Sequence, residues 1–254
     1  AMRLVPPDMI AVDEVHCLSA WSDTFRSAFL QIGDFITNHR PRVVSAFTAT
    51  CPPKVEADIR RVLCLEKARK AIHYPRRQNL DLRSSPFLGF ESMFNILSRP
   101  IDGSAVVYCV SRKNTEIVAQ ALQQALPDKR VMFYHGGMKP PERSSVQDDF
   151  ARGDIDIICA TNAFGMGVDK SNVRAVLHRD IASSMDGQSQ EAGRAGRDGK
   201  YSLCQTLFDS ESIRTHEFMI RTSCPLFKEV KAVYEVMQTA KDPTGQVSMS
   251  SEDI

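Results

Sequence analysis

The sequence predicts an α/β protein with doubly wound parallel sheets, in which short buried strands alternate with covering helices. Short apolar runs alternate with longer segments of helical periodicity along most of the chain, which is typical of parallel strands joined by crossover helices. The composition, with 43% hydrophobic and 25% charged residues, is that of an ordinary globular protein. At 254 residues the chain has room for two domains, because one domain usually takes about 100–200 residues.

The first series of elements contains two strands and two helices. Apolar runs at residues 9–12 and 43–47 predict buried strands. Between them, apolar residues at helical spacing over 25–36 predict a helix with one apolar stripe. A second helix is expected to begin at Pro52-Pro53, because the first N–H groups of a helix lack partners in any case. This series resembles the last part of a domain.

A second and longer series follows a break in the pattern. Residues 76–85 lie between Pro75 and Pro86 and read as an interdomain connector. Strands are expected at 105–110, 131–134, 155–159, 175–178 and 203–208, helices at 115–126 and 141–150, and an amphipathic helix over 226–237. We therefore expect a partial domain at 1–80, a complete doubly wound domain at 81–210 and a helical extension at 211–254, which is a possible start of a further domain.

Charge, cysteine usage and hydropathy limit the classes of function. The net charge of +1 excludes a strongly basic protein, so any contact with nucleic acid must come from local arginine clusters. Seven cysteines without a Cys-x-x-Cys pair favour free thiols in a reducing cytoplasm over a metal site or disulfides. The sequence lacks an apolar run of the ~18 residues that a membrane span needs. We expect a cytoplasmic protein, associated with the nucleoid if bacterial, and no membrane partner.

Acidic side chains follow the first predicted strand. Asp13 and Glu14 come directly after the apolar run at 9–12, and a parallel strand delivers its last side chains to the edge where such folds bind ligands. In nucleotide hydrolases an acid at this place coordinates Mg²⁺ and a neighbouring acid orients the attacking water. A solvated acidic turn is the alternative, and it would be favoured for two isolated acids.

Hydroxyl and guanidinium groups occur at two further places. Thr48-Ala49-Thr50 ends the second strand, where its hydroxyls are also expected to cap the following helix. Arg194 and Arg197 stand three apart among small residues. On one helix face this spacing would present both guanidinium groups to one phosphate-bearing target. A glycine-rich surface turn is the alternative for this segment.

Taken in order, these motifs resemble those of superfamily 2 helicases, and in detail those of the RecQ family. The segments that carry the resemblance are Asp13-Glu14-Val15-His16 with the Trp21 loop, Thr48-Ala49-Thr50, Ala160-Thr161-Asn162-Ala163-Phe164-Gly165-Met166-Gly167-Val168-Asp169, and Gln190 to Gly199. The resemblance covers about residues 8–210. It implies a partial first and a complete second RecA-like domain, which bind ATP and Mg²⁺ at the cleft between them.

The resemblance also implies roles for single residues. Asp13 would hold Mg²⁺ through water, Glu14 would be the catalytic base, and His16 would couple the ATP site to DNA together with Thr48 and Thr50. Gln190 would belong to the catalytic set. Arg194 and Arg197 would reach the ATP phosphates, with Arg197 as the arginine finger, and Gly167 and Asp169 would lie at the nucleotide.

Contacts with DNA are implied at two sets of positions. Trp21, Phe25 and Arg26 would sense single-stranded DNA, and stacking and cation–π contact give a physical reason for this trio. The residues expected near the DNA track are Tyr108, Ser111, Arg112, His135, Gly136, Thr161 and Asn162. The partner would be single-stranded or forked DNA, and from the family the direction of movement would be 3′ to 5′.

One departure from the family pattern affects these expectations. No Gly-x-x-x-x-Gly-Lys-Ser/Thr segment occurs in the sequence, so the loop that cradles phosphates is missing. We expect a chain truncated at its front, inactive by itself, with an exposed sheet edge that favours self-association. Three hypotheses remain: a DNA helicase of RecQ type, an RNA helicase of the same superfamily, and a non-catalytic nucleic-acid-binding module.

Overall fold

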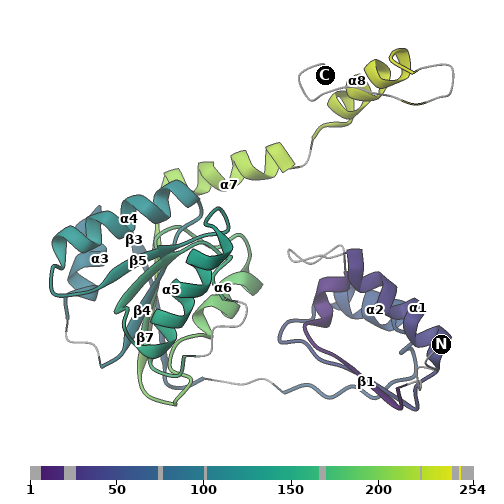
Figure 1. Cartoon of the computed structure of the whole chain (residues 1–254), viewed down its shortest axis with the longest axis horizontal. Coiled ribbons are helices and arrows are strands. Elements are labelled where there is room, and N and C mark those ends of the chain that lie inside the picture. Colours follow the sequence, from purple (N-terminus) through teal and green to yellow (C-terminus); the bar gives the residue numbers. More distant parts are fainter. Residues whose placement is uncertain are drawn as a thin grey trace.

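Two separate parallel sheets form the framework of the protein. We obtained a computed structural model, which describes residues 7–19, 27–73, 77–99, 102–165, 170–223, 225–241 and 246. The first sheet has two strands, β1 and β2, and the second has six, in the order β3-β8-β7-β4-β6-β5. Figure 1 shows each sheet with its own helices, joined by the segment that leads from α2 to β3. The parallel α/β class predicted from the sequence is therefore confirmed.

The first unit packs two helices against its two strands. Strand β1 (Met9–Val12) pairs with β2 (Val43–Ala46) along its whole length. Helices α1 (Leu30–His39) and α2 (Pro53–Val62) follow the strands, and short 3₁₀ turns precede α1 at η1 (Val15–Leu18) and η2 (Ser27–Phe29). The buried core consists of Val12, Val15, Leu18, Ile36, Val55, Ile59 and Leu63. As predicted, proline stands at the start of α2, whereas α1 begins five residues later than the spacing indicated.

The second unit contains a six-stranded parallel sheet. Its strands are β3 (Leu80–Pro86), β4 (Ser104–Tyr108), β5 (Val131–Tyr134), β6 (Ile157–Ala160), β7 (Val173–His178) and β8 (Ser202–Phe208). Tyr108 at the end of β4 lies opposite Ala160 of β6 and His178 of β7. The carboxyl ends of the central strands therefore meet at one edge, which is where doubly wound folds bind ligands.

Helices cover both faces of this sheet. Helices α3 (Phe90–Leu97) and α4 (Arg112–Ala125) pack on one face, and α5 (Pro140–Arg152) and α6 (Met185–Ala192) pack on the other. Strand β4 shows how the sequence produces this arrangement. Val107 joins the core under α4 while its neighbours Val106 and Tyr108 join the core under α5 and α6, because successive strand residues point to opposite faces. A strand buried on both sides must be apolar throughout.

The segment interpreted as a connector over 76–85 is largely a strand, so that prediction was wrong. Strand β3 pairs in parallel with β8 from Leu80 to Pro86 and forms the edge of the second sheet. Its residues are half-buried or exposed, Leu82 being 69% exposed. An edge strand has a single neighbour and can carry charged residues such as Asp81 and Arg83. Such a sequence lacks the apolar run by which the central strands were found.

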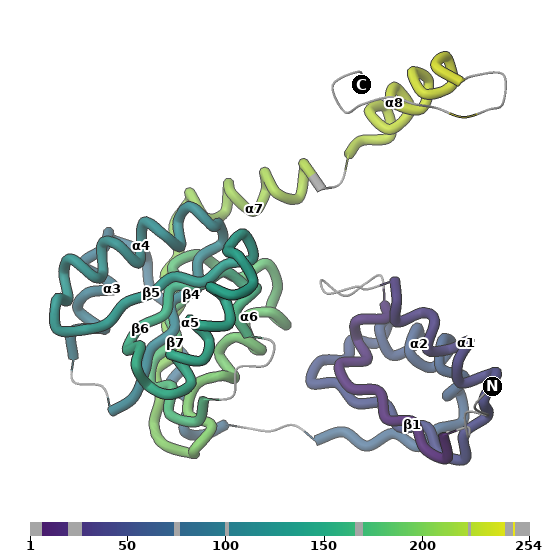
Figure 2. Tube along the Cα trace, viewed as in Figure 1, coloured from purple at the N-terminus to yellow at the C-terminus, as the bar shows by residue number. Residues whose placement is uncertain are grey.

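Two helices follow the second sheet. They are α7 (Ser210–Ser223) and α8 (Phe227–Thr239), and Figure 2 shows them as the helices nearest the C-terminus. The apolar stripe predicted for the second of them exists, but Val230, Val233 and Met237 are 37–50% exposed. Within the described part of the chain, none of the helices has the length and apolar character needed to cross a membrane.

Candidate functional site

Asp13 and Glu14 lie on a strained turn at the carboxyl end of β1. The backbone N–H of Glu14 donates a 2.8 Å hydrogen bond to Asp13 Oδ1, and both residues are exposed. Glu14 has φ 49° and ψ 39°, in the left-handed region that residues other than glycine seldom adopt. Backbone strain of this kind costs about 1–3 kcal/mol and is concentrated at functional sites. The turn directs two carboxylates away from the core at the edge where a ligand would bind.

His16 links this turn to the end of β2. Its Nδ1 lies 2.9 Å from Thr48 Oγ1 and 3.3 Å from Glu14 Oε2, and the residue is 8% exposed. The Thr48 hydroxyl donates to the Thr50 carbonyl, so its oxygen accepts from His16 and the proton of the imidazole is assigned to Nδ1. The three residues proposed to couple the ATP site to DNA, His16, Thr48 and Thr50, thus form one hydrogen-bonded chain.

The expectation that these threonines cap the next helix was wrong. The N-cap of α2 is Pro52, which has no side-chain capping hydrogen bond. The Thr48 hydroxyl is already engaged by His16 and by Thr50, whose N–H lies 3.3 Å from it. A hydroxyl has one proton and two acceptor lone pairs. In Thr48 they are used by the Thr50 carbonyl, the Thr50 N–H and the His16 ring.

The arginine pair lies beyond helix α6 and not on one of its faces, which corrects the prediction from spacing. Helix α6 ends at Ala192 and Gly193 is its C-cap. Gly196 has φ +56°, and a side chain there would meet the Lys200 carbonyl at 2.7 Å. Gly196 turns the chain after the helix through its positive φ, so Arg194 and Arg197 belong to a loop. We call residues 193–200 the arginine loop.

The two arginines have different surroundings within this loop. Arg194 is half-buried, and its Nη1 donates a 2.6 Å hydrogen bond to the Gly165 carbonyl, whereas Arg197 is exposed. An added Cβ at Gly165 would lie 2.1 Å from Arg194 Nη2, at φ +155°. A side chain at position 165 would thus displace the guanidinium. Arg194 connects the arginine loop to the loop after β6, while Arg197 is the member of the pair that faces solvent.

The loop after β6 is anchored by aromatic side chains. Phe164 is 1% exposed, and its ring lies 5.1 Å from that of Tyr134 and 5.5 Å from that of Phe150. The Tyr108 hydroxyl donates to the Phe164 carbonyl over 3.3 Å. Tyr108 is 3% exposed, and burial raises the pKa of its hydroxyl well above the usual range. This placement makes Tyr108 a core residue and does not support direct contact with a nucleic acid.

Gln190 and its neighbour lie on different sides of α6. Gln190 is exposed, while Glu191 Oε2 lies 2.9 Å from Nε2 of His178, which is 1% exposed. The His178 ring stacks on Tyr108 at 5.6 Å. The buried pair of Glu191 and His178 holds the helix against the end of β7 and leaves Gln190 facing outward.

The other residues expected along the DNA track follow the carboxyl ends of β4, β5 and β6 at one edge of the second sheet. Ser111 is the N-cap of α4 and accepts a hydrogen bond from the Asn114 N–H. Thr161 is 8% exposed and its hydroxyl accepts from the Ala163 N–H. The hydroxyls of Ser111 and Thr161 therefore bind nearby backbone N–H groups, as serine and threonine often do at the ends of strands and helices. Arg112 and Asn162 are exposed.

His135 stands beside Arg112 at this edge. Its Nε2 lies 2.9 Å from Glu116 Oε1 and its Nδ1 accepts from the Gly137 N–H, so the proton is assigned to Nε2. A side chain at Gly137 would meet both Arg112 Nη1 and His135 Nδ1 within 3.0–3.3 Å. Arg112, Asn162 and the glycines that follow β5 are exposed at this edge. The predicted residues Trp21, Phe25, Arg26, Gly167 and Asp169 lie outside the described residues.

The cysteines of the described residues are free thiols. Cys17, Cys109, Cys159 and Cys204 are buried, and Cys51 and Cys64 are exposed. Burial raises the pKa of the Cys204 thiol to about 11, and that of Cys109 and Cys159 further. These thiols are protonated and pack as small apolar groups. Among the described residues, groups of three or more potential metal ligands are absent.

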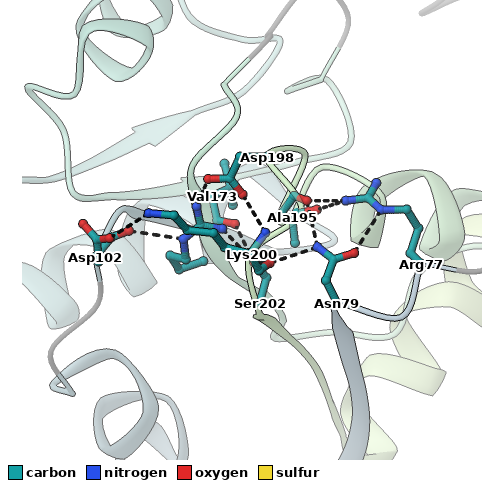
Figure 3. Close-up of polar contacts among 10 residues, drawn as sticks. Arg77, Asn79, Asp102, Val173, Ala195, Asp198, Lys200 and Ser202 are labelled. Carbon is teal, nitrogen blue, oxygen red and sulfur yellow. Dashed lines mark hydrogen bonds and ion pairs between the residues drawn. The ribbon is translucent and has the colours of Figure 1, made fainter.

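The structure adds residues that the motifs did not indicate. Arg77 and Asn79 donate hydrogen bonds to backbone carbonyls of the arginine loop (Figure 3). Arg174 of β7 forms an ion pair with Asp198 at the other side of the same loop. These contacts join residues far apart in the chain, and the sequence carries no signal for them.

Comparison with known proteins places the chain in a family. Residues 89–199 match the family described as "Helicase conserved C-terminal domain". The chain is 36% identical to ATP-dependent helicase SGS1 of Saccharomyces cerevisiae over 87% of its own length and 15% of that protein. It is 34% identical to ATP-dependent DNA helicase RecQ of Bacillus subtilis, over 85% of the chain and 36% of the relative. The chain belongs to the RecQ family of helicases. It spans less than half the length of these relatives, since even the probable ATP-dependent DNA helicase RecS of Bacillus subtilis, 30% identical over 95% of the chain, is covered to 49%.

Solved structures confirm the fold that the family implies. The chain superposes on Dbp5 of S. cerevisiae bound to RNA and ADP BeF3 with a TM-score of 0.65 at 17% identity, covering 84% of the chain and 56% of Dbp5. It also matches Mss116p bound to ssRNA and AMP-PNP, with a TM-score of 0.60 at 19% identity over 97% of the chain and 52% of Mss116p. At such identities the likeness shows a RecA-like fold and no shared substrate.

Proposed function

We propose that this RecQ-family chain provides most of the motor of an ATP-dependent DNA helicase that moves 3′ to 5′ along single-stranded DNA. One observation carries the proposal. Glu14, which follows Asp13 at the end of β1, contacts His16, and His16 in turn forms a hydrogen bond with Thr48 after β2. This chain of contacts links an acid of the proposed hydrolysis site to the end of the neighbouring strand. A module that only binds nucleic acid would have little use for such a link.

The chemistry of the side chains fits ATP and Mg²⁺. Carboxylate oxygens are the protein ligands that Mg²⁺ accepts, often through water, and Asp13 offers them at an exposed turn. When bound, the ion would neutralise charge on the phosphate oxygens. Glu14 would accept the proton of the attacking water, and its contact with His16 gives it a defined orientation.

Arg197 is proposed to stabilise the charge that develops on the transferred phosphoryl group. Arg197 is an exposed residue, and an arginine finger contributes about 10³–10⁵-fold to the rate of phosphoryl transfer. Arg194 is tied to the Gly165 carbonyl in this structure, so a role at the phosphates would require it to leave that bond. A phosphate-binding loop must complete the site, and none occurs among these 254 residues, so we propose that the chain by itself is inactive.

The DNA is proposed to lie along the carboxyl edge of the second sheet. Arg112 and Asn162 are exposed there and present a cation and an amide, groups that suit phosphate and sugar contacts. Trp21, Phe25 and Arg26 are proposed as the sensor of single-stranded DNA on the basis of the family resemblance alone.

The test is ATP hydrolysis by this chain and by a version extended to include the phosphate-binding loop, each with single-stranded DNA, with RNA and with neither. We expect turnover only in the extended version and stimulation by DNA. In that version, Glu14→Gln should retain ATP binding and lose turnover, and Arg197→Ala should lose about 10³-fold. Arg83→Ala is the control, because Arg83 is an exposed arginine paired with Asp81 on β3.

Each other outcome selects another hypothesis. Stimulation by RNA alone would indicate an RNA helicase, and DNA binding without turnover in the extended version would indicate a binding module. Activity of Glu14→Gln or Arg197→Ala within about tenfold of the wild type would refute the assigned role. Unwinding of duplexes with a 5′ tail, but not with a 3′ tail, would refute the direction.

A further inference from the structure

The backbone carbonyls of the arginine loop, which follows helix α6, accept hydrogen bonds from a side chain in another part of the chain. Carbonyls outside the hydrogen-bond ladders of helices and strands need such partners where they are shielded from water. Arg77 supplies them, because its Nη2 donates to the carbonyls of Ala195 at 2.8 Å and Gly196 at 2.6 Å, and its Nη1 lies 3.4 Å from that of Gly193. One guanidinium therefore holds the first half of the arginine loop (Figure 3).

Asn79 holds the second half of the same loop. Its Nδ2 donates to the carbonyls of Gly196 at 2.8 Å and Lys200 at 2.9 Å, which closes the turn between them. Asn79 Oδ1 accepts from Arg77 Nε at 3.4 Å. Gly196 leaves no room for a side chain, since an added Cβ would lie 2.5 Å from Asn79 Nδ2. We call these two side chains the Arg77–Asn79 clamp.

The far side of the arginine loop is fixed to the second sheet. Arg174 of β7 forms an ion pair with Asp198, and its Nη1 donates to Ser202 Oγ at 3.0 Å. The Asp198 carboxylate also accepts from the Lys200 N–H at 3.1 Å. The loop that carries Arg197 is thus held on one side by the sheet and on the other by the clamp (Figure 3).

The clamp stands where the two units of the chain are joined. Arg77 and Asn79 precede β3, and the chain before them leads back to α2 of the first unit. A guanidinium that forms hydrogen bonds with three carbonyls fixes direction as well as distance, because its donors form a rigid fork. These hydrogen bonds therefore fix the arginine loop to the segment that precedes β3.

We propose that Arg77 and Asn79 are positioning residues that set the orientation of Arg197 by fixing the arginine loop to the segment that precedes β3. As far as it concerns catalysis, this inference rests on the proposed function. A group that must act on a phosphoryl transition state gains from being held in place before the reaction. Loosening the loop should therefore lower kcat for ATP and leave ground-state binding almost unchanged.

Two readouts test the clamp. The first is amide hydrogen exchange of residues 193–200 in this chain, and the second is kcat and KM for ATP in the version extended to the phosphate-binding loop. We expect Arg77→Gln and Asn79→Ala each to speed exchange in the arginine loop about tenfold or more, because charged or bridging hydrogen bonds are lost. kcat should fall about tenfold while KM changes less than about twofold.

Two variants serve as controls. Arg83→Gln removes an exposed arginine of β3 that forms an ion pair with Asp81 of the same strand, and it should alter neither readout. Arg77→Lys keeps the charge and loses the fork, so it should restore part of kcat and part of the protection, and it also replaces Arg77→Gln if that variant does not fold.

The outcomes separate the clamp from the proposed function. Faster exchange with lower kcat, and no effect in Arg83→Gln, supports the inference. Unchanged exchange overturns the clamp, and faster exchange with unchanged kcat overturns its role in positioning Arg197. If the wild-type extended version does not hydrolyse ATP, the proposed function fails, and exchange alone then decides whether Arg77 and Asn79 hold the loop.

Discussion

The contact between Gly165 and Arg194 allows one substitution to be worked out in detail. An alanine Cβ at position 165 would lie 2.1 Å from Arg194 Nη2 and 2.5 Å from Cζ, so the guanidinium must move and lose its 2.6 Å bond to the Gly165 carbonyl. A hydrogen bond to a charged group contributes about 1.5–3 kcal/mol. The backbone at φ +155° adds strain of about 1–3 kcal/mol for a residue with a side chain. Gly165→Ala should therefore destabilise the second unit by about 3–5 kcal/mol.

Gly199→Ala is the matched control for this prediction. Gly199 also has a positive φ, of +82°, but an added Cβ would meet nothing within 4 Å, so its cost should be the backbone strain of about 1–2 kcal/mol. Thermal unfolding followed by circular dichroism should show Gly165→Ala melting about 5–10 °C below Gly199→Ala. In an Arg194→Ala background, the cost of Gly165→Ala should shrink by about 1.5–3 kcal/mol. Equal melting of the two glycine variants, or strict additivity with Arg194→Ala, would refute the reasoning.

Three further predictions concern the core and the first unit. Phe164→Ala should lower the free energy of unfolding by about 3–5 kcal/mol, measured by thermal unfolding. The reason is that Phe164, which is 1% exposed, packs between Tyr134 and Phe150. A loss below about 1 kcal/mol would contradict this packing. Thr48→Val should lower the free energy of unfolding by about 1 kcal/mol, because it removes the hydrogen-bond partner of His16. Urea unfolding followed by the fluorescence of Trp21, the single tryptophan, measures this change. An unshifted unfolding midpoint would contradict the hydrogen bond between His16 and Thr48. Hydrogen bonds from Arg61 and Ser19 lower the pKa of Asp58 in the folded protein. The stability that these bonds contribute is therefore fully present above the pKa that Asp58 has in the unfolded chain, and it is lost as the pH falls through the lower pKa of the folded state. Asp58→Asn should flatten that acid limb in urea unfolding below about pH 4, and an unchanged pH profile would show that Asp58 is not responsible.

The central strands of the second sheet were predictable, because their burial on both faces leaves no room for polar residues. The apolar runs placed β5 without error and β4, β6, β7 and β8 within a few residues. The edge strand β3 was missed for the opposite reason. With a neighbour on one side only, it tolerates Asp81 and Arg83, so its hydrogen bonds leave no apolar pattern in the sequence.

The sequence predicted which residues belong to the candidate site better than it predicted how they are arranged. The motifs identified His16 and Thr48, and the structure brings them within 2.9 Å. The spacing of Arg194 and Arg197 suggested one helix face, yet helix α6 ends at Ala192 and the chain turns at Gly196, between the two arginines. The contact of Arg77 with the arginine loop spans 116 to 119 residues of sequence, and no periodicity or spacing connects positions so far apart.

The different surroundings of the two arginines explain how a glycine-rich loop can present a charged group in a defined place. Glycines allow the sharp turn after α6, but by themselves they leave the backbone free to adopt many conformations. In this protein, side chains restrain the arginine loop. Arg194 ties the loop to the one after β6, Arg77 binds its backbone carbonyls, and Arg174 forms an ion pair with Asp198. Three of the cations around this loop thus serve its shape. Arg197 is the arginine of the pair that lies on the exposed side of the structure so formed, and its usefulness to a phosphate depends on the others staying where they are.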